Sequence, residues 1–249
     1  MAPPKPNAEA TDLSRCDYVA RPRLGIITGS GPEAGMDLWA KLLQENRRRL
    51  GPAFRGDIDA PALSIVSDPE LGLSMELEKT AETVWRALHA DILALDGQVA
   101  AFSIACNTLN LFAGRIGELT LKSEFISFRD VLHDYLQRSG VERVCLLGAR
   151  PVAALGQWSP YSDLREVVEF EPVTQGDVLH QLIYDIKVSG AADPGVRARF
   201  SGLLASIESA TVLLACTELP LLANIATDKN LVDVTQLVAE AMLDRCTII

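Results

Sequence analysis

The chain has 249 residues, of which 48% are hydrophobic and 22% charged, and its formal net charge is −10. This composition excludes a disordered or fibrous protein, and the acidic charge disfavours a general nucleic-acid surface, where clustered positive charge is typical. No apolar run reaches the roughly 18 residues that a membrane span needs. We therefore expect a globular protein with no nucleic-acid partner and no membrane partner.

The start of the chain differs in composition from the rest. Residues 1–20 hold three Pro and few large apolar groups, which predicts a flexible N-terminal tail. The same stretch lacks the apolar core of a signal peptide, which favours a cytoplasmic location, where thiols stay reduced. The chain has five Cys whose spacings fit no zinc pattern, so we expect free thiols and no metal.

Strands and helices alternate through the first half. Strands are predicted at 24–28, 60–67 and 99–105, with a helix starting near Pro32 and another over 74–96. The first helix is expected to bury Leu38, Trp39, Leu42 and Leu43, and the second Leu77, Val84, Leu88, Ile92 and Leu95. This pattern is a βαβαβ unit of an α/β fold.

The turn Gly29-Ser30-Gly31-Pro32 joins the first strand to its helix. Two interpretations remain open: the glycines let the backbone approach an anionic ligand at the helix start, or the turn simply needs small residues. Pro32 suits the first turn of the helix in either case.

A second alternation follows. Strands are predicted at 125–127, 143–149, 166–171, 209–215 and 230–234, and helices at 176–190, 194–209 and 235–244, with one more helix ending at Gly140 and a helix or loop over 219–226. The order repeats that of the first half. The sequence thus predicts an α/β fold with parallel sheets.

Each half ends in a strand followed at once by a thiol. Ala105-Cys106-Asn107-Thr108 closes the first half, and Ala215-Cys216-Thr217-Glu218 follows the strand at 209–215. The carboxyl ends of parallel strands are where open α/β sheets build their crevices. We therefore expect the two thiols and their polar neighbours to form one site.

Four stretches together resemble the aspartate/glutamate racemases, within the wider group of hydantoin racemases and arylmalonate decarboxylases. They are "TGSGPEAG" (28–35), "ACNTLN" (105–110), "LIYDIKVSG" (182–190) and "LLACTELPLLA" (213–223). Their order and spacing match the family over residues 24 to 241, and the aspartate-racemase branch is the nearest.

The resemblance implies two pseudo-symmetric Rossmann-like α/β domains with an interdomain cleft. It assigns residues 21–113 plus 219–249 to a first domain carrying Cys106, and 114–218 to a second carrying Cys216. It also implies a small-molecule amino-acid substrate, a homodimer, and no pyridoxal phosphate or metal.

The resemblance also implies roles for individual residues. Cys106 and Cys216 would be the two bases that invert Cα from opposite faces, which is the arrangement that inversion by proton transfer requires. The other implied contacts are Asn107, Thr108, Thr217 and Gly31 with the substrate's α-carboxylate, and Lys187 with a side-chain carboxylate.

Some of the family's side-chain contacts are replaced. Ser74 stands where the family has the Arg that binds the side-chain carboxylate of aspartate, so the identity of the substrate is open, with Arg150 as a candidate replacement cation. Three further positions depart: Ser30 stands for Met, Asn110 for His, and Ala149 or Val152 for Thr. Besides a cofactor-independent racemase, two alternatives remain: a decarboxylase or cis–trans isomerase using one Cys, and a non-catalytic binding relative.

Overall fold

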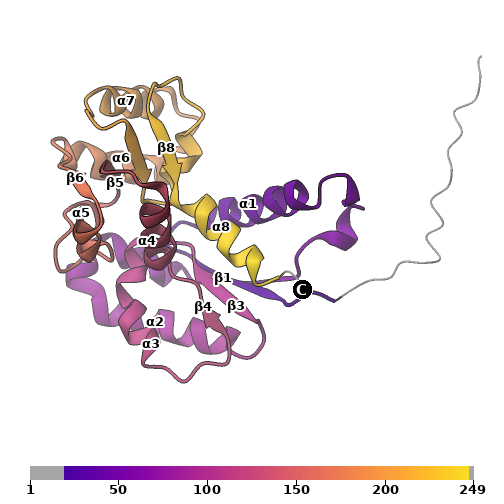
Figure 1. The fold of residues 1–249 in the computed structure, drawn as a ribbon. Coiled ribbons are helices and arrows are strands. Elements are labelled where there is room, and N and C mark those ends of the chain that lie inside the picture. The colour runs from indigo at the N-terminus through magenta and orange to yellow at the C-terminus, as the bar shows by residue number, and fades with distance from the viewer. Residues whose placement is uncertain (1–19, 247–249) are drawn as a thin grey trace, which may run out of the picture.

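The structure, a computed structural model, describes residues 20–246, so all but the last residue of the predicted tail lies outside the described part. Two four-stranded sheets, both entirely parallel, organise the chain (Figure 1). The first contains β1 (Leu24–Thr28), β2 (Leu63–Ser67), β3 (Ala101–Ile104) and β4 (Glu124–Phe125). The second contains β5 (Arg143–Leu147), β6 (Glu169–Glu171), β7 (Thr211–Leu214) and β8 (Asn230–Asp233). The predicted α/β fold with parallel sheets is confirmed.

The two sheets repeat one strand order. It is β2-β1-β3-β4 in the first sheet and β6-β5-β7-β8 in the second, so each half places its first strand between its second and third. Register pairs Ile27 of β1 with Ile104 of β3, and Leu147 of β5 with Leu214 of β7. The segments that leave each central pair of strands therefore emerge together at one sheet edge.

The predicted domain boundaries place two strands, β4 and β8, in the wrong sheet. β4 lies within 114–218 but pairs with β3 of the first sheet, and β8 lies within 219–249 but pairs with β7 of the second. The reason is parallel pairing, since each strand adds to the edge beside the strand that precedes it. The division into two domains at those boundaries stays a prediction.

Helices cover the first sheet. They are α1 (Pro32–Leu50), α2 (Leu77–Leu95) and α3 (Ala113–Gly117), with 3₁₀ segments η2 (Gly51–Ala53), η3 (Asp57–Asp59), η4 (Pro69–Glu76) and η5 (Thr108–Phe112). The helix predicted over 74–96 is thus a 3₁₀ segment followed by an α-helix. All five residues expected to be buried on α2 are buried.

The prediction for the buried face of α1 is wrong for two of its four residues. Leu38 and Leu42 are buried, but Trp39 and Leu43 are exposed. The buried stripe includes Ala34, Leu38 and Leu42 at four-residue spacing, and a residue one position further along a 3.6-residue helix is turned about 100° away. Trp39 and Leu43 therefore lie on the outer face.

The second half carries the remaining helices. They are α4 (Phe128–Ser139), α5 (Arg150–Ala153), α6 (Gly176–Ser189), α7 (Pro194–Ala205) and α8 (Val234–Asp244), with η6 (Ser162–Glu166) and η7 (Leu219–Leu222). The 219–226 stretch is therefore a short 3₁₀ segment followed by a loop. None of the helices between residues 20 and 246 is long and apolar enough to span a membrane.

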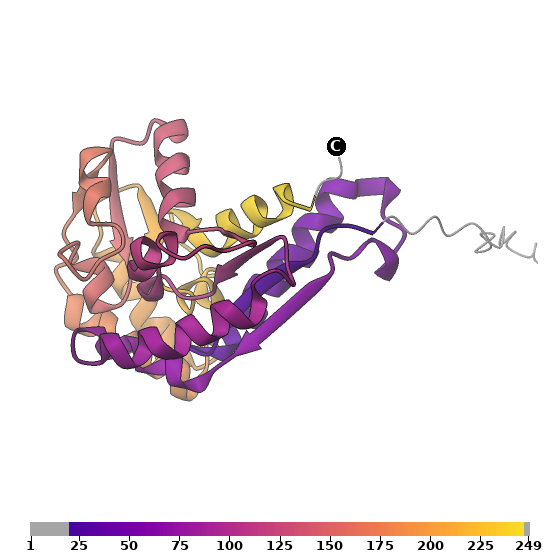
Figure 2. The same cartoon turned by 90° about the horizontal axis from the view of Figure 1, so that it is seen from below.

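The two sheets share one hydrophobic cluster. It includes Leu24 and Ile26 of β1, Val144 and Leu146 of β5, and residues of α8. Helix α8 follows the last strand of the second sheet yet packs against α1 and α4, and Figures 1 and 2 both show α8 beside α1. Burial of common apolar surface therefore holds the two halves together near the sheet edges.

Candidate functional site

The two thiols emerge two residues after the ends of β3 and β7. Cys106 and Cys216 are each only 7% exposed, and both are free. Thr217 Oγ1 donates a long hydrogen bond, 3.5 Å, to the carbonyl oxygen of Ala105. The segments that follow the two strands therefore touch, although 112 residues separate these partners.

Two serine hydroxyls surround the sulfur of Cys106. Its S–H donates to Ser30 Oγ at 3.3 Å, and Ser74 Oγ lies 3.9 Å from the sulfur. The two hydroxyl oxygens are 2.5 Å apart, and both serines are buried. Ser30 comes from the turn after β1 and Ser74 from η4. A hydroxyl can donate as well as accept, so either serine can turn its O–H group toward the sulfur.

Cys216 has a carboxylate as its neighbour instead. Its S–H donates to Glu218 Oε2 at 2.9 Å, and the Glu218 side chain is 3% exposed. Burial raises the pKa of the Cys216 thiol well above its usual range, the negative charge of Glu218 raises it further, and Lys187 opposes the change. Cys216 therefore holds its proton in this arrangement.

Lys187 links the two thiol environments. Its ammonium donates to the carbonyl oxygen of Ser30 at 3.0 Å and forms an ion pair with Glu218 Oε1. Burial lowers the pKa of Lys187, but its interactions with Glu218, Cys216 and Cys106 outweigh burial and raise it. Ser30 thus contacts Cys106 through its hydroxyl and Lys187 through its backbone carbonyl, and Glu218 connects Lys187 to Cys216.

Glycine is required at two positions of the turn after β1. Gly29 and Gly31 have φ of 128° and 109°, which side-chain-bearing residues rarely adopt. A Cβ on Gly29 would collide with the carbonyl of Asp68, and a Cβ on Gly31 with the Lys187–Glu218 pair. The positive end of α1 begins at this turn and favours the nearby Glu218 carboxylate.

Asn107 and Tyr161 form a buried pair beside the thiols. The phenol of Tyr161 donates to Asn107 Oδ1, and the two residues are 0% and 2% exposed. Asn107 Nδ2 is buried with no hydrogen-bond partner in the described part of the chain. An unpaired buried N–H group costs about 1–3 kcal/mol, so Asn107 Nδ2 is a candidate donor to a ligand.

The other expected residues take clear places. Thr108 is buried at the start of η5, one residue after Asn107. Asn110, which replaces the family's His, donates from Nδ2 to the carbonyl oxygen of Cys106 at 2.9 Å and accepts from Phe128 N at 2.8 Å. Asn110 therefore holds the loop that carries the thiol. Arg150 pairs with Asp177, and its side chain is 58% exposed.

The histidines occupy structural positions. His89 stacks on Trp85, and His180 accepts a hydrogen bond at Nδ1 from the backbone N–H of Arg150 at 3.1 Å. Burial, and then the charge of Arg150, lowers the pKa of His180. Within residues 20–246, no group of three or more His, Cys, Asp or Glu side chains is arranged to hold a metal ion.

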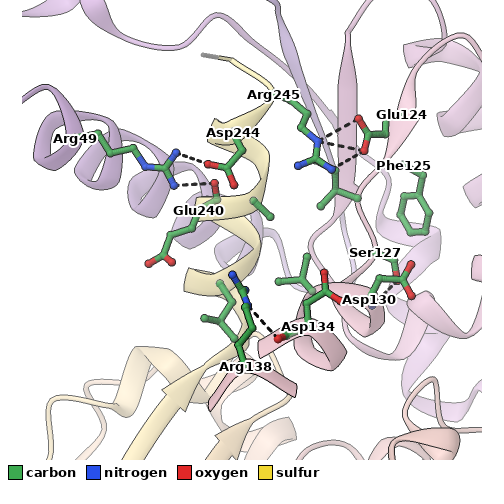
Figure 3. A pocket seen from close by; sticks show the side chains of 14 residues that line it. Arg49, Glu124, Phe125, Ser127, Asp130, Asp134, Arg138, Glu240, Asp244 and Arg245 are labelled. Carbon is green, nitrogen blue, oxygen red and sulfur yellow. Dashed lines mark hydrogen bonds and ion pairs between the residues drawn. The ribbon is translucent and has the colours of Figure 1, made fainter. Parts of the chain in front are cut away.

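A separate hollow of about 510 Å³ lies between α4, α8 and the β4 region (Figure 3). Two of its guanidinium groups are paired with carboxylates, Arg49 with Asp244 at 2.7 Å and Arg245 with Glu124 at 2.8 Å, and the third, Arg138, donates to the backbone carbonyl oxygen of Asp134 at 3.1 Å. Because no thiol is among its lining residues, this hollow is separate from the site of Cys106 and Cys216.

Sequence reasoning missed three residues of the site. Ser30 was noted only as a departure from the family, Glu218 only as part of a motif, and Tyr161 not at all. The position of Glu218, two residues after a strand-end thiol, was a usable signal. Tyr161 lies in an irregular connection with no periodicity, so nothing local marked it.

Comparison with known proteins identifies the fold. No protein-family model and no curated protein matches the chain. Among solved structures, the aspartate racemase of Picrophilus torridus is 23% identical with a TM-score of 0.75, and the match covers 90% of this chain and 93% of that one. An aspartate racemase homologue from Pyrococcus horikoshii OT3 is 20% identical with a TM-score of 0.68, covering 89% and 97%.

A glutamate racemase from Campylobacter jejuni subsp. jejuni is more distant. It is 12% identical with a TM-score of 0.58, and the match covers 90% of this chain and 85% of that one. The chain therefore has the fold of aspartate and glutamate racemases over nearly its whole length, which confirms the sequence resemblance at the level of fold.

Proposed function

We propose that this chain is a pyridoxal-phosphate-independent amino-acid racemase that inverts Cα by proton transfer between Cys106 and Cys216. The observation that carries the proposal is the pair of buried thiols at equivalent strand ends, joined through Ser30, Lys187 and Glu218. The fold shared with aspartate and glutamate racemases supports it.

The chemistry needs a base and an acid on opposite faces of Cα. One sulfur, as thiolate, removes the Cα proton, and the electron pair of the broken C–H bond delocalises into the α-carboxylate. The other sulfur, as thiol, returns a proton to the opposite face, which inverts the centre. Donors from Asn107, Thr108 and Thr217 meet the negative charge that develops on the carboxylate.

The two thiols have different neighbours. Ser30 and Ser74 can donate to a thiolate at Cys106, whereas Glu218 disfavours a second negative charge at Cys216. Cys106 is therefore the base and Cys216 the acid in one direction. After turnover the roles are exchanged, and Lys187 offsets the new charge at Cys216.

The substrate class follows from the charges beside the thiols. Lys187 is paired with Glu218, and Ser74 carries no charge where the racemase family has an arginine. A side-chain carboxylate would have to compete with Glu218 for Lys187. We therefore propose an amino-acid substrate for which a side-chain carboxylate is not required.

One experiment distinguishes three candidate functions: a racemase, a non-catalytic binding protein and an enzyme that uses a single thiol. The parent protein is incubated in heavy water with individual L- and D-amino acids and, separately, with an arylmalonate whose CO₂ release is measured, with and without chelator and with no cofactor added. Chiral chromatography and mass spectrometry then follow inversion and deuterium at Cα. Inversion with deuterium incorporation supports the proposal. Binding without exchange indicates a non-catalytic relative, and release of CO₂ from a malonate without racemisation indicates a decarboxylase.

A homodimer is proposed as the assembly, with α1 at its interface. The exposed face of α1 carries Met36 at 66% exposure, Trp39 at 43% and Leu43 at 38%. Two hollows border this face, one of about 590 Å³ beside Met36 and one of about 310 Å³ beside Leu43. A run of large apolar side chains on a helix surface favours a protein partner.

The charges on α1 favour a second copy as that partner. Glu33 and Arg47 lie seven residues before and after Ala40, and both are exposed. Antiparallel pairing of two α1 helices about Ala40 brings Glu33 opposite the partner's Arg47 at both ends. Such self-complementarity is what a two-fold interface requires. We also propose a cytoplasmic location, supported by the four free cysteines of the described residues.

A further inference from the structure

Tyr161 is a large polar side chain placed where a hydrophobic one would pack. It lies between α5 and η6 and belongs to the hydrophobic cluster shared by the two sheets. Its backbone N–H donates to Ser159 Oγ at 3.2 Å, and Ser159 Oγ in turn donates to the carbonyl oxygen of Val152 at 2.8 Å. The connection that carries the ring is therefore held in place.

The phenol is bound to one side of the Asn107 amide. Its hydroxyl donates to Asn107 Oδ1, so the carbonyl side of the amide is turned toward Tyr161. The NH₂ group is fixed on the other side, buried and without a partner in the described residues. Burial raises the pKa of Tyr161 well above its usual range, and nearby Cys106 and Cys216 raise it further. Tyr161 thus keeps its proton and remains a donor.

We propose that Tyr161 is a positioning residue that fixes the Asn107 amide so that its NH₂ group donates to the ligand's carboxylate. This proposal rests on the proposed function for the identity of that ligand as an amino acid. Without the phenol, the amide is free to rotate by 180° and present Oδ1, whose partial negative charge repels a carboxylate. The cost is greatest in the transition state, when charge on the carboxylate grows.

Tyr161→Phe tests this with the least change in packing, because it removes only the hydroxyl. We expect kcat/KM to fall by about 10- to 100-fold, with most of the loss in kcat. Tyr135→Phe is the matched control, since Tyr135 packs against the same hydrophobic cluster. It should leave both constants unchanged.

A double-mutant cycle with Asn107→Ser shows whether Tyr161 acts through Asn107. If it does, Tyr161→Phe changes kcat/KM by less than about twofold once the amide is gone. An equal loss in both backgrounds, or parent-like kinetics for Tyr161→Phe, overturns the proposal while the parent's activity still supports the proposed function.

A second measurement does not depend on activity. The side-chain NH₂ signals of Asn107 are identified in a ¹⁵N–¹H spectrum by their loss in Asn107→Ser. In the parent, Asn107 should give two sharp signals that shift on titration with the amino acid of highest activity, or with L-serine if none is active. In Tyr161→Phe the signals should broaden or move. Unchanged NH₂ signals in Tyr161→Phe overturn the proposal whether or not the chain is a racemase.

Discussion

The carboxylate of Glu218 accepts the thiol proton of Cys216 at 2.9 Å, and its other oxygen binds the ammonium of Lys187. The sulfur of Cys106 has two neutral hydroxyls, those of Ser30 and Ser74, as its hydrogen-bond neighbours among the described residues. The two thiols therefore differ in charge environment although they follow equivalent strands. This asymmetry is the basis for the opposite starting roles that we propose for the two sulfurs.

Both thiols should be essential. Cys106→Ser and Cys216→Ser should each lower kcat by about 10²- to 10⁴-fold, because the remaining sulfur has no partner to complete inversion. Chiral chromatography measures the loss, and circular dichroism checks the fold. Cys145→Ala is the matched control: Cys145 is buried in β5, its pKa is raised to about 12 by burial, and its loss should not affect kcat. Full racemisation by either Ser variant would contradict the two-base mechanism.

Glu218→Gln should lower the pKa of the Cys216 thiol. The amide carries no charge, so one cause of the raised thiol pKa disappears and Lys187 is left to favour the thiolate. The rate of Cys216 alkylation, measured against pH in a Cys106→Ser background, should therefore rise at lower pH than in the parent. Glu82→Gln, an exposed carboxylate paired with Arg115, is the control. An unchanged alkylation profile would show that Glu218 does not control this thiol.

Aspartate should be a poor substrate. Removing one partner of a buried charge pair costs about 2–5 kcal/mol of binding, and Ser74 supplies no charge. We expect kcat/KM for serine or asparagine to equal or exceed that for aspartate. Ser74→Arg should raise the ratio of kcat/KM for aspartate to kcat/KM for serine by about tenfold. Ser74→Gln controls for side-chain length without charge. A parent that strongly prefers aspartate, with no gain in Ser74→Arg, would show that the role assigned to Ser74 is wrong.

Asp91 should destabilise the fold at neutral pH. Burial, and then the charge of Asp68, raises its pKa from 3.8 to about 6, and one of its oxygens has no hydrogen-bond partner in the described chain. The folded state then binds more protons than the unfolded state between about pH 4 and 6, so stability falls as pH rises through that range. Asp91→Asn should raise the free energy of unfolding by about 1 kcal/mol at pH 7.5 and by little at pH 4. The gain is modest because the carboxyl group is partly solvated.

Thermal unfolding measures this effect, with an expected rise in Tm of about 2–4 °C at pH 7.5. Asp96→Asn is the matched contrast. Asp96 accepts backbone N–H bonds from Ser123 at 3.0 Å and Lys122 at 2.7 Å, and these contacts lower its pKa. Its stabilisation is present at neutral pH and lost in acid, so Asp96→Asn should lower Tm at pH 7.5. A fall in Tm for Asp91→Asn at pH 7.5 would show that the ionised Asp91 side chain does not destabilise the folded state.

The α1 surface should control assembly. Trp39→Glu places a charge in the middle of the exposed apolar run and should convert a dimer to a monomer in light scattering, with the fold retained. Leu93→Glu is the control, because Leu93 is exposed to a similar degree, 52%, on α2. If Trp39→Glu leaves the dimer intact, or the parent is monomeric, α1 is not the interface.

The local sequence pattern was enough to predict most of the strands and helices of the described chain. The 3.6-residue period identified the buried side of α2, and strand patterns predicted all eight strands, because backbone periodicity decides these features within a few residues. Parallel strands also explain why thiols after β3 and β7 were expected in one place. The same reasoning failed for Trp39 and Leu43, since the sequence does not reveal how far round α1 the packing surface extends.

The chemical character of the site depended on contacts between distant segments. Lys187 reaches the carbonyl oxygen of Ser30 across 157 residues of chain, and Tyr161 reaches Asn107 across 54. No local spacing encodes either contact. The sequence alone therefore determined that two thiols end equivalent strands of an α/β fold. Only the tertiary structure decided that Glu218 pairs with Lys187 and that Tyr161 donates a hydrogen bond to Asn107, because charge pairing and burial depend on which segments packing brings together.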